Sequence, residues 1–172
     1  MTEKDTGEVL DWLDTRRARV LQIAAEEISS AAVKDSPRVR EFWRVVAPKE
    51  WTPAQLRQAA RQLEWCGVFD LWCYHEAKLT TAPWELGRGF AYRMPRTDDP
   101  RPGDLMIIPQ PFWHHGLVES YYMVGDKPWL RSIEGNTPDI RRRDRPAPKG
   151  ALYYSIEPWL RAALERETSA LP

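Results

Sequence analysis

The N-terminal part of the chain repeats its apolar residues every three or four positions, which is the spacing of helices that bury one face. Such stripes predict helices over residues 6–32, 39–46, 53–63 and 64–77. Thr52, Pro53 and Gln55 form a start signal for the third of these helices. Threonine caps the helix, proline suits its first turn, and the glutamine side chain reaches back to the capping residue.

The second half of the chain alternates short apolar runs with turn residues, a pattern typical of antiparallel strands. The predicted strands are Leu105–Ile108, Phe112–Val124, Trp129–Asn136, Ile140–Asp144 and Ala151–Ile156. Gly125–Pro128 turns the second into the third as a hairpin, and Pro158 opens a last helix. We therefore predict the α+β class, as a single domain over residues 1–172 with the N-terminal helices packed on a C-terminal antiparallel sheet.

The region between these halves, residues 78–111, is interrupted repeatedly by proline and glycine. Within it, residues 84–92 place aromatic and basic side chains on an irregular backbone. Loops carry both functional residues and simple connections, so this stretch is either the wall of a substrate groove or an ordinary surface loop.

Charge and cysteine content narrow the classes of partner and compartment. Lys and Arg together number 25, as do Asp and Glu. This balance argues against a protein held to nucleic acid or to a membrane by its charge. No N-terminal apolar run predicts a signal peptide or a membrane span, so we expect synthesis in the cytoplasm. Two cysteines, seven residues apart and about 10 Å apart along a helix, do not form a disulfide framework.

Cys66 is the first candidate for chemistry, because it stands at the front of an apolar helical segment and is followed by Gly67. A thiol at a helix N-terminus faces the positive end of the helix dipole, which favours the nucleophilic thiolate. Gly67 leaves room for a substrate carbonyl near the backbone. Two alternatives stay open: Cys66 is a small buried apolar residue, or the helix before it continues through Leu63 and places the thiol in mid-helix.

Histidine and carboxylate candidates follow in the predicted hairpin. Because strand side chains alternate faces, His114, Gly116 and Val118 share one face, and His115 shares the other. Glu134 and Asn136 lie on one face of the returning strand. A helix packed on the face of His114 would bring it to Cys66. We predict His114 as general base and Glu134 as the group that orients it, with Asn136 as the alternative third member and His115 as a neighbour.

These motifs together resemble the CHAP amidase/peptidase family of papain-like cysteine hydrolases. The matching segments are Trp65-Cys-Gly-Val-Phe69, Gly103-Asp104, His114-His-Gly-Leu-Val118 and Glu134-Gly-Asn136, in an order that covers roughly residues 23–156. The resemblance implies a papain-like fold and cleavage of an amide bond in peptidoglycan, either the muramoyl–L-alanine amide or a peptide cross-bridge. It also implies Cys66 as nucleophile and His114 as base. We expect neither a cofactor nor a metal.

The route to such a substrate would be non-classical if no secretion signal carries the protein. A toxin effector injected by a secretion machine, a phage lysin and a housekeeping enzyme all remain open. They would act at the bacterial cell wall or in the periplasm, and an effector would need an immunity protein in its producer. We expect a monomer.

Two other hypotheses, a metal site and a binding module, compete with the hydrolase hypothesis. Cys73, His75, His114 and His115 are of metal-ligating types, but Cys73 and His75 point apart on a helix, and the paired spacings of zinc sites are absent from the sequence. The second hypothesis is a non-enzymatic papain-like module that binds cell-wall glycan or a protein partner.

The run Arg141–Arg143 with Arg145 is of a type that binds phosphates, although a solvated strand face fits a neutral chain better.

Overall fold

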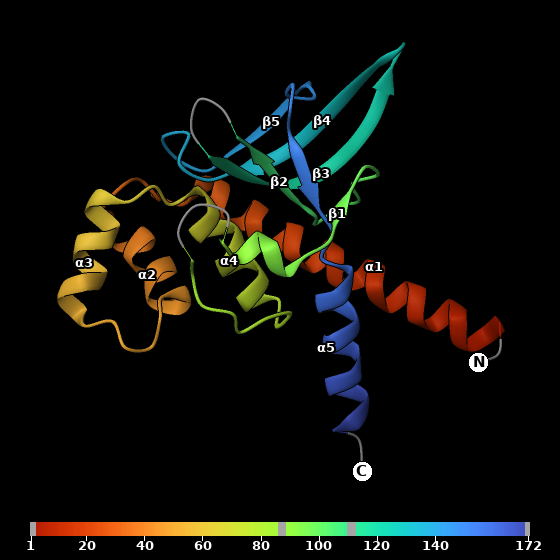
Figure 1. The fold of residues 1–172 in the computed structure, drawn as a ribbon, viewed down its shortest axis with the longest axis horizontal. Coiled ribbons are helices and arrows are strands. Elements are labelled where there is room, and N and C mark those ends of the chain that lie inside the picture. Colours follow the sequence, from red (N-terminus) through yellow and green to blue (C-terminus); the bar gives the residue numbers. More distant parts are fainter. Residues whose placement is uncertain (1–2, 86–88, 110–112, 171–172) are drawn as a thin grey trace.

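A computed structural model describes residues 3–85, 89–109 and 113–170, without the side chains of residues 3–6. The α-helices are α1 (Glu3–Glu26), α2 (Pro37–Val46), α3 (Pro53–Gln62), α4 (Cys66–Glu76) and α5 (Glu157–Ser169), and the short 3-10 helices are η1 (Glu27–Ser29) and η2 (Gly89–Arg93). The strands are β1 (Arg96–Thr97), β2 (Leu105–Ile108), β3 (His114–Val124), β4 (Lys127–Glu134), β5 (Arg141–Pro146) and β6 (Leu152–Tyr154). Helices α1 to α4 precede an antiparallel six-stranded sheet, so the predicted α+β class is confirmed (Figure 1).

The predicted cap of α3 is present in full. The Thr52 hydroxyl accepts a hydrogen bond from the backbone N–H of Gln55, and the Gln55 side chain accepts one from the backbone N–H of Thr52. The exchange satisfies two donors that the first turn of a helix otherwise leaves unpaired.

Helix α3 ends before Cys66, although no glycine or proline marks the break. Leu63 has extended backbone angles, and α4 begins at Cys66 itself. Between them Trp65 is fully buried, with its ring centroid 6.2 Å from that of Phe42 on α2. Burial of Trp65 in the core accounts for the break, because a continuous helix would have to give up that packing.

The strands are paired in the order β1-β6-β2-β3-β4-β5. The predicted hairpin of β3 and β4 is confirmed, with a tighter turn at Gly125 and Asp126 than expected. Leu117 pairs with Ile133 across it. Phe112, the predicted start of the first hairpin strand, lies outside the described residues.

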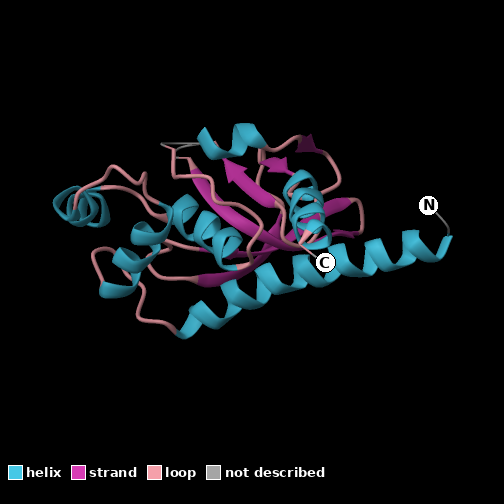
Figure 2. Cartoon of the chain, turned by 90° about the horizontal axis from the view of Figure 1, so that it is seen from below, coloured by secondary structure: helices cyan, strands magenta, loops and turns pink. Residues whose placement is uncertain are grey.

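The two faces of the sheet carry separate apolar clusters. Leu105, Ile107, Leu117 and Ile133 belong to the main core together with the buried side of α4, and we call their side of the sheet the helix face. Met106, Val118 and Leu130 form a smaller cluster on the opposite side, the far face. Helix α4 contacts β3, and α1 contacts both α4 and β4. Figures 1 and 2 show α1 running along the helix face of the sheet.

A buried ion pair joins α1 to the start of the sheet. Arg17 Nη1 lies 2.7 Å from Asp104 Oδ1, and both side chains are almost completely buried. The same Asp104 oxygen accepts a hydrogen bond from the backbone N–H of Ile156, at the entry to α5. The Gly-Asp motif before β2 thus has a structural task, because its carboxylate ties three elements together. No helix among the described residues is long and apolar enough to cross a membrane.

Candidate active site

Cys66 is the first residue of α4 and lies against the sheet. Its side chain is only 4% exposed, and its Sγ atom lies 3.5 Å from Nδ1 of His115 and 3.8 Å from the carbonyl oxygen of Trp113. The side chain of Trp65, which precedes α4, makes no capping hydrogen bond. The side chain of that residue therefore does not occupy the backbone N–H groups of the first turn, which point out of the same end of the helix at which the thiol lies.

The histidine that meets the thiol is His115, whereas the sequence led us to expect His114. His115 is 2% exposed and shares the helix face with Leu117. The expectation rested on Gly116 leaving a gap for the helix, but that gap opens on the far face. A Cβ atom on Gly116 would lie 2.8 Å from Glu134 Cγ and 3.0 Å from Met106 Cε.

His114 forms a second polar cluster on the far face. Its Nε2 atom lies 2.9 Å from Glu134 Oε2, which confirms that these two residues are neighbours, as predicted. Ser132 Oγ donates to Glu134 Oε1 at 2.6 Å, and Arg145 also donates to that oxygen. Burial opposes ionisation of Glu134, but the hydrogen bond from His114 and the other donors outweigh it and lower the pKa of the carboxyl. This cluster and the Cys66–His115 pair lie on opposite sides of one strand.

Asn136 lies beyond the end of the strand that was expected to hold it. Strand β4 ends at Glu134, and Asn136 has a φ of 62°, so the alternation assumed for the strand does not continue to it. Its side-chain amide donates to Glu64, which also pairs with Lys34. The prediction that Asn136 lies next along from Glu134 and His114 was wrong, because the backbone turns after β4.

Aromatic rings enclose the Cys66–His115 pair. The ring of Phe90 lies 5.9 Å from that of His115 in a stacked arrangement, and the ring of Trp84 lies 6.4 Å from it. A Cβ atom on Gly67 would lie 3.0 Å from two carbons of Trp84, so the indole fills the space that was expected to admit a substrate carbonyl. Trp84 and Phe90 belong to the segment considered as a groove wall, of which residues 86–88 lie outside the described residues.

The thiol of Cys66 is held in its protonated form in the folded protein. Burial raises the pKa of Cys66 to about 12, while hydrogen bonds from the backbone at His115 and Gly67 act in the opposite direction. This reverses the expectation drawn from the helix dipole. Desolvation of a buried anion is the larger effect here.

Asp70 is a buried carboxyl that sequence reasoning did not single out. It lies one turn beyond Cys66 on α4, is completely buried, and neither of its oxygens has a hydrogen-bond partner among the described residues. Burial raises the pKa of Asp70 well above its usual range. An aspartate among the apolar positions of a buried helix was the available signal.

The remaining candidate residues are buried in the core or engaged in hydrogen bonds and ion pairs. Cys73 is a free, fully buried cysteine in the core. His75, expected at the surface, is half-buried and hydrogen-bonds the carbonyl of Ala82 at 2.7 Å. Arg141 and Arg142 pair with Asp139 and Glu119. No group of three or more metal-ligating side chains comes together in the part of the chain that the structure describes.

Alkylation of the folded protein should report the state of the Cys66 thiol. With a pKa of about 12, roughly one thiol in 10⁵ is ionised at pH 7, so iodoacetamide should label Cys66 slowly there. The rate should rise about tenfold per pH unit towards alkaline pH, because only the thiolate reacts. The labelling rate at Cys66, followed by mass spectrometry between pH 6 and 10, measures this. Cys73 in a Cys66→Ser variant is the control for opening of the fold, and rapid labelling that levels off below pH 8 would contradict the prediction.

The site thus consists of a thiol at a helix start, an imidazole on the facing strand and an aromatic enclosure. No protein-family model, curated protein or solved structure matches the chain.

Proposed function

We propose that the protein is a cysteine hydrolase in which Cys66 attacks an amide carbonyl and His115 is the general base. The observation that carries this proposal is the 3.5 Å contact between Cys66 Sγ and His115 Nδ1 at the N-terminus of α4. A nucleophile within hydrogen-bond reach of a base is the arrangement that covalent catalysis needs. Since the thiol is protonated at rest, His115 takes its proton as the attack proceeds, without a preformed ion pair.

The reaction can be written with these residues and water alone. The indole of Trp84, which packs against Gly67, first has to move aside to admit the substrate. His115 Nδ1 then takes the thiol proton while Sγ bonds to the carbonyl carbon, and the oxyanion accepts hydrogen bonds from backbone N–H groups at the start of α4. The C–N bond then breaks, and the leaving amine receives the proton from His115. Water next gives a proton to His115 and adds to the thioester. Release of the acid breaks the C–S bond and returns the proton to sulfur.

The proposed substrate is an amide bond of bacterial peptidoglycan, in a papain-like fold of the CHAP type. Support comes from the order of the sequence motifs and from a cysteine at a helix start that packs on an antiparallel sheet. The motif match selects His114, whereas the contact with the thiol is made by His115, so we assign the base by the contact. The protein would reach the wall as an injected effector, with an immunity protein in its producer, or as a lysin.

Digestion of purified peptidoglycan tests this proposal directly. The wild-type protein should release fragments with new amino and carboxyl ends, which mass spectrometry identifies as products of a muramoyl–L-alanine amidase or of a cross-bridge peptidase. Digestion in the presence of EDTA should give the same products, since no metal takes part. If intact, folded protein leaves several peptidoglycan types unchanged, the hydrolase proposal fails.

Burial of the thiol favours a second candidate, a binding module that keeps the fold without the chemistry. Cys66 is 4% exposed, and its raised pKa is that of a structural cysteine. A binding module would retain peptidoglycan in a pull-down without releasing fragments. The two candidates therefore differ in a single measurement, the appearance of soluble products.

A further inference from the structure

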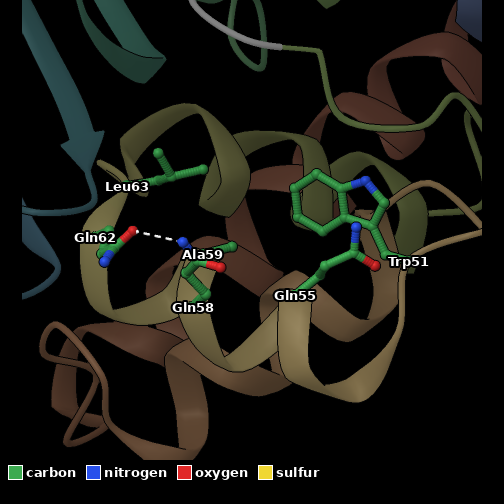
Figure 3. Close-up of a pocket in the computed structure, with 6 residues that line it drawn as sticks. All are labelled: Trp51, Gln55, Gln58, Ala59, Gln62 and Leu63. Atoms are coloured by element: carbon green, nitrogen blue, oxygen red, sulfur yellow. Dashed lines mark hydrogen bonds between the residues drawn. The ribbon is translucent and has the colours of Figure 1, made fainter.

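A neutral pocket lies on α3, away from the thiol. It has a volume of about 220 Å³ and is lined by Trp51, Gln55, Gln58, Ala59, Gln62 and Leu63. Figure 3 shows the indole of Trp51 at one end, the three glutamine side chains along the helix and Leu63 at the other end. None of the lining residues carries a charge, so the pocket offers nothing to offset the charge of an ionic ligand.

The indole of Trp51 is fixed in place. Its ring stacks on that of the fully buried Trp43, with 5.9 Å between the centroids and 19° between the planes. Trp51 itself is only half-buried. A rigid aromatic surface of this kind binds the apolar C–H side of a flat ligand at little cost in side-chain entropy.

The three glutamine amides are also held in defined positions. The Gln55 side-chain oxygen accepts from the backbone N–H of Thr52 at 2.8 Å, which leaves the amide N–H groups of Gln55 available. Gln58 Nε2 donates to Gln62 Oε1 at 3.0 Å, as the dashed line in Figure 3 shows. This bond leaves the Gln58 oxygen as an acceptor and the Gln62 nitrogen as a donor. The pocket therefore presents both donors and acceptors beside an aromatic surface.

We propose that this pocket binds a neutral sugar that carries an acetamido group. A pyranose ring has an apolar C–H side for the indole, and its hydroxyl and amide groups match the free ends of the glutamines. Ala59 and Leu63 are the apolar aliphatic residues of the lining, and they offer a contact for the acetyl methyl. The volume lies below the roughly 300–1,000 Å³ of sites for drug-sized ligands, which suits one sugar ring at a time.

The pocket is close in sequence to the start of α4. Leu63, which lines it, precedes Cys66 by three residues, and the break between α3 and α4 lies between them. A glycan strand bound on α3 would therefore enter on the side of the molecule where α4 begins. Sugar binding does not depend on the proposed hydrolysis, and the two can fail separately.

Calorimetric titration of the full chain with tri-N-acetylchitotriose tests this proposal. We expect saturable binding, with maltotriose, which lacks acetamido groups, binding at least about tenfold more weakly. Trp51→Ala should weaken binding by about tenfold or more through loss of the stacking surface. Gln62→Ala, at an exposed position that does not endanger the fold, should weaken it several-fold.

Gln22→Ala is the matched control, because Gln22 is another helical glutamine that donates to a side chain four residues on, at Glu26 on α1. It should bind the trisaccharide like the wild type, and so should Cys66→Ser. Absence of binding to the wild type would overturn the proposal, as would unchanged affinity in Gln62→Ala and in folded Trp51→Ala. Binding without peptidoglycan cleavage would leave the sugar site standing and remove the hydrolase.

Discussion

Replacement of Cys66 by serine is expected to abolish peptidoglycan hydrolysis by the protein, with a loss of roughly four orders of magnitude or more in turnover. The change keeps the size of the side chain but replaces the thiol by a hydroxyl, which His115 at 3.5 Å from Cys66 cannot activate to the same degree. The fold should survive, because the change is nearly isosteric and the new hydroxyl, like the thiol, faces Nδ1 of His115. Product release from peptidoglycan, followed by chromatography, measures the loss.

Cys73→Ser is the matched control for this experiment. Cys73 is on the same helix, is fully buried and belongs to the core. Its replacement should cost some stability, because a buried hydroxyl needs a hydrogen-bond partner, but turnover should stay near that of the wild type. If Cys66→Ser hydrolyses peptidoglycan as fast as the Cys73→Ser protein, Cys66 is not the nucleophile.

Local signals were sufficient to predict the helices and the hairpin. The Thr52–Gln55 cap and the apolar stripes are read within a few residues of chain, and the elements that they predict are present. The break before Cys66 is different, because it depends on the burial of Trp65 beside Phe42, a contact between α2 and a residue far along the chain. The local sequence has no glycine or proline at that point, so a continuous helix stayed open as an alternative.

The choice of sheet face could not be made from the sequence. Both faces of β3 carry apolar residues, since Leu117 joins the main core and Val118 joins the smaller cluster. Alternation therefore groups residues correctly without saying which group meets the helix. His114 and Glu134 were placed together correctly on that basis, and their common face was then assigned to the wrong side.

The charge state of the thiol shows a second limit of sequence reasoning. A cysteine at a helix start is expected to have a lowered pKa, but the expectation holds only where water or a cation supports the anion. Here Trp84 and Phe90 enclose the neighbouring histidine, and Cys66 is almost fully buried. Side chains from distant segments create this enclosure, so its effect on the pKa becomes visible only in the folded structure.

Replacement of His115 by glutamine is expected to lower turnover by roughly 10²- to 10⁴-fold, the contribution typical of a general acid–base group. Glutamine is chosen because it keeps polar volume between the rings of Trp84 and Phe90, where alanine would leave a cavity. The measurement is the rate of product release as a function of pH. The acid limb of the wild-type profile, which reports protonation of the base, should disappear in the His115→Gln protein.

The companion variant His114→Gln separates the two histidines. Its turnover should stay within a few-fold of the wild type, because the contacts of His114 are with Glu134 on the far face. Stability should fall instead by about 1–3 kcal/mol in denaturant unfolding, since the buried carboxylate of Glu134 loses a charge-assisted partner while Ser132 and Arg145 remain. Should His114→Gln abolish hydrolysis while His115→Gln keeps it, the base would be His114 oriented by Glu134. That outcome would contradict the assignment of His115, because β3 separates the thiol from His114 in this structure.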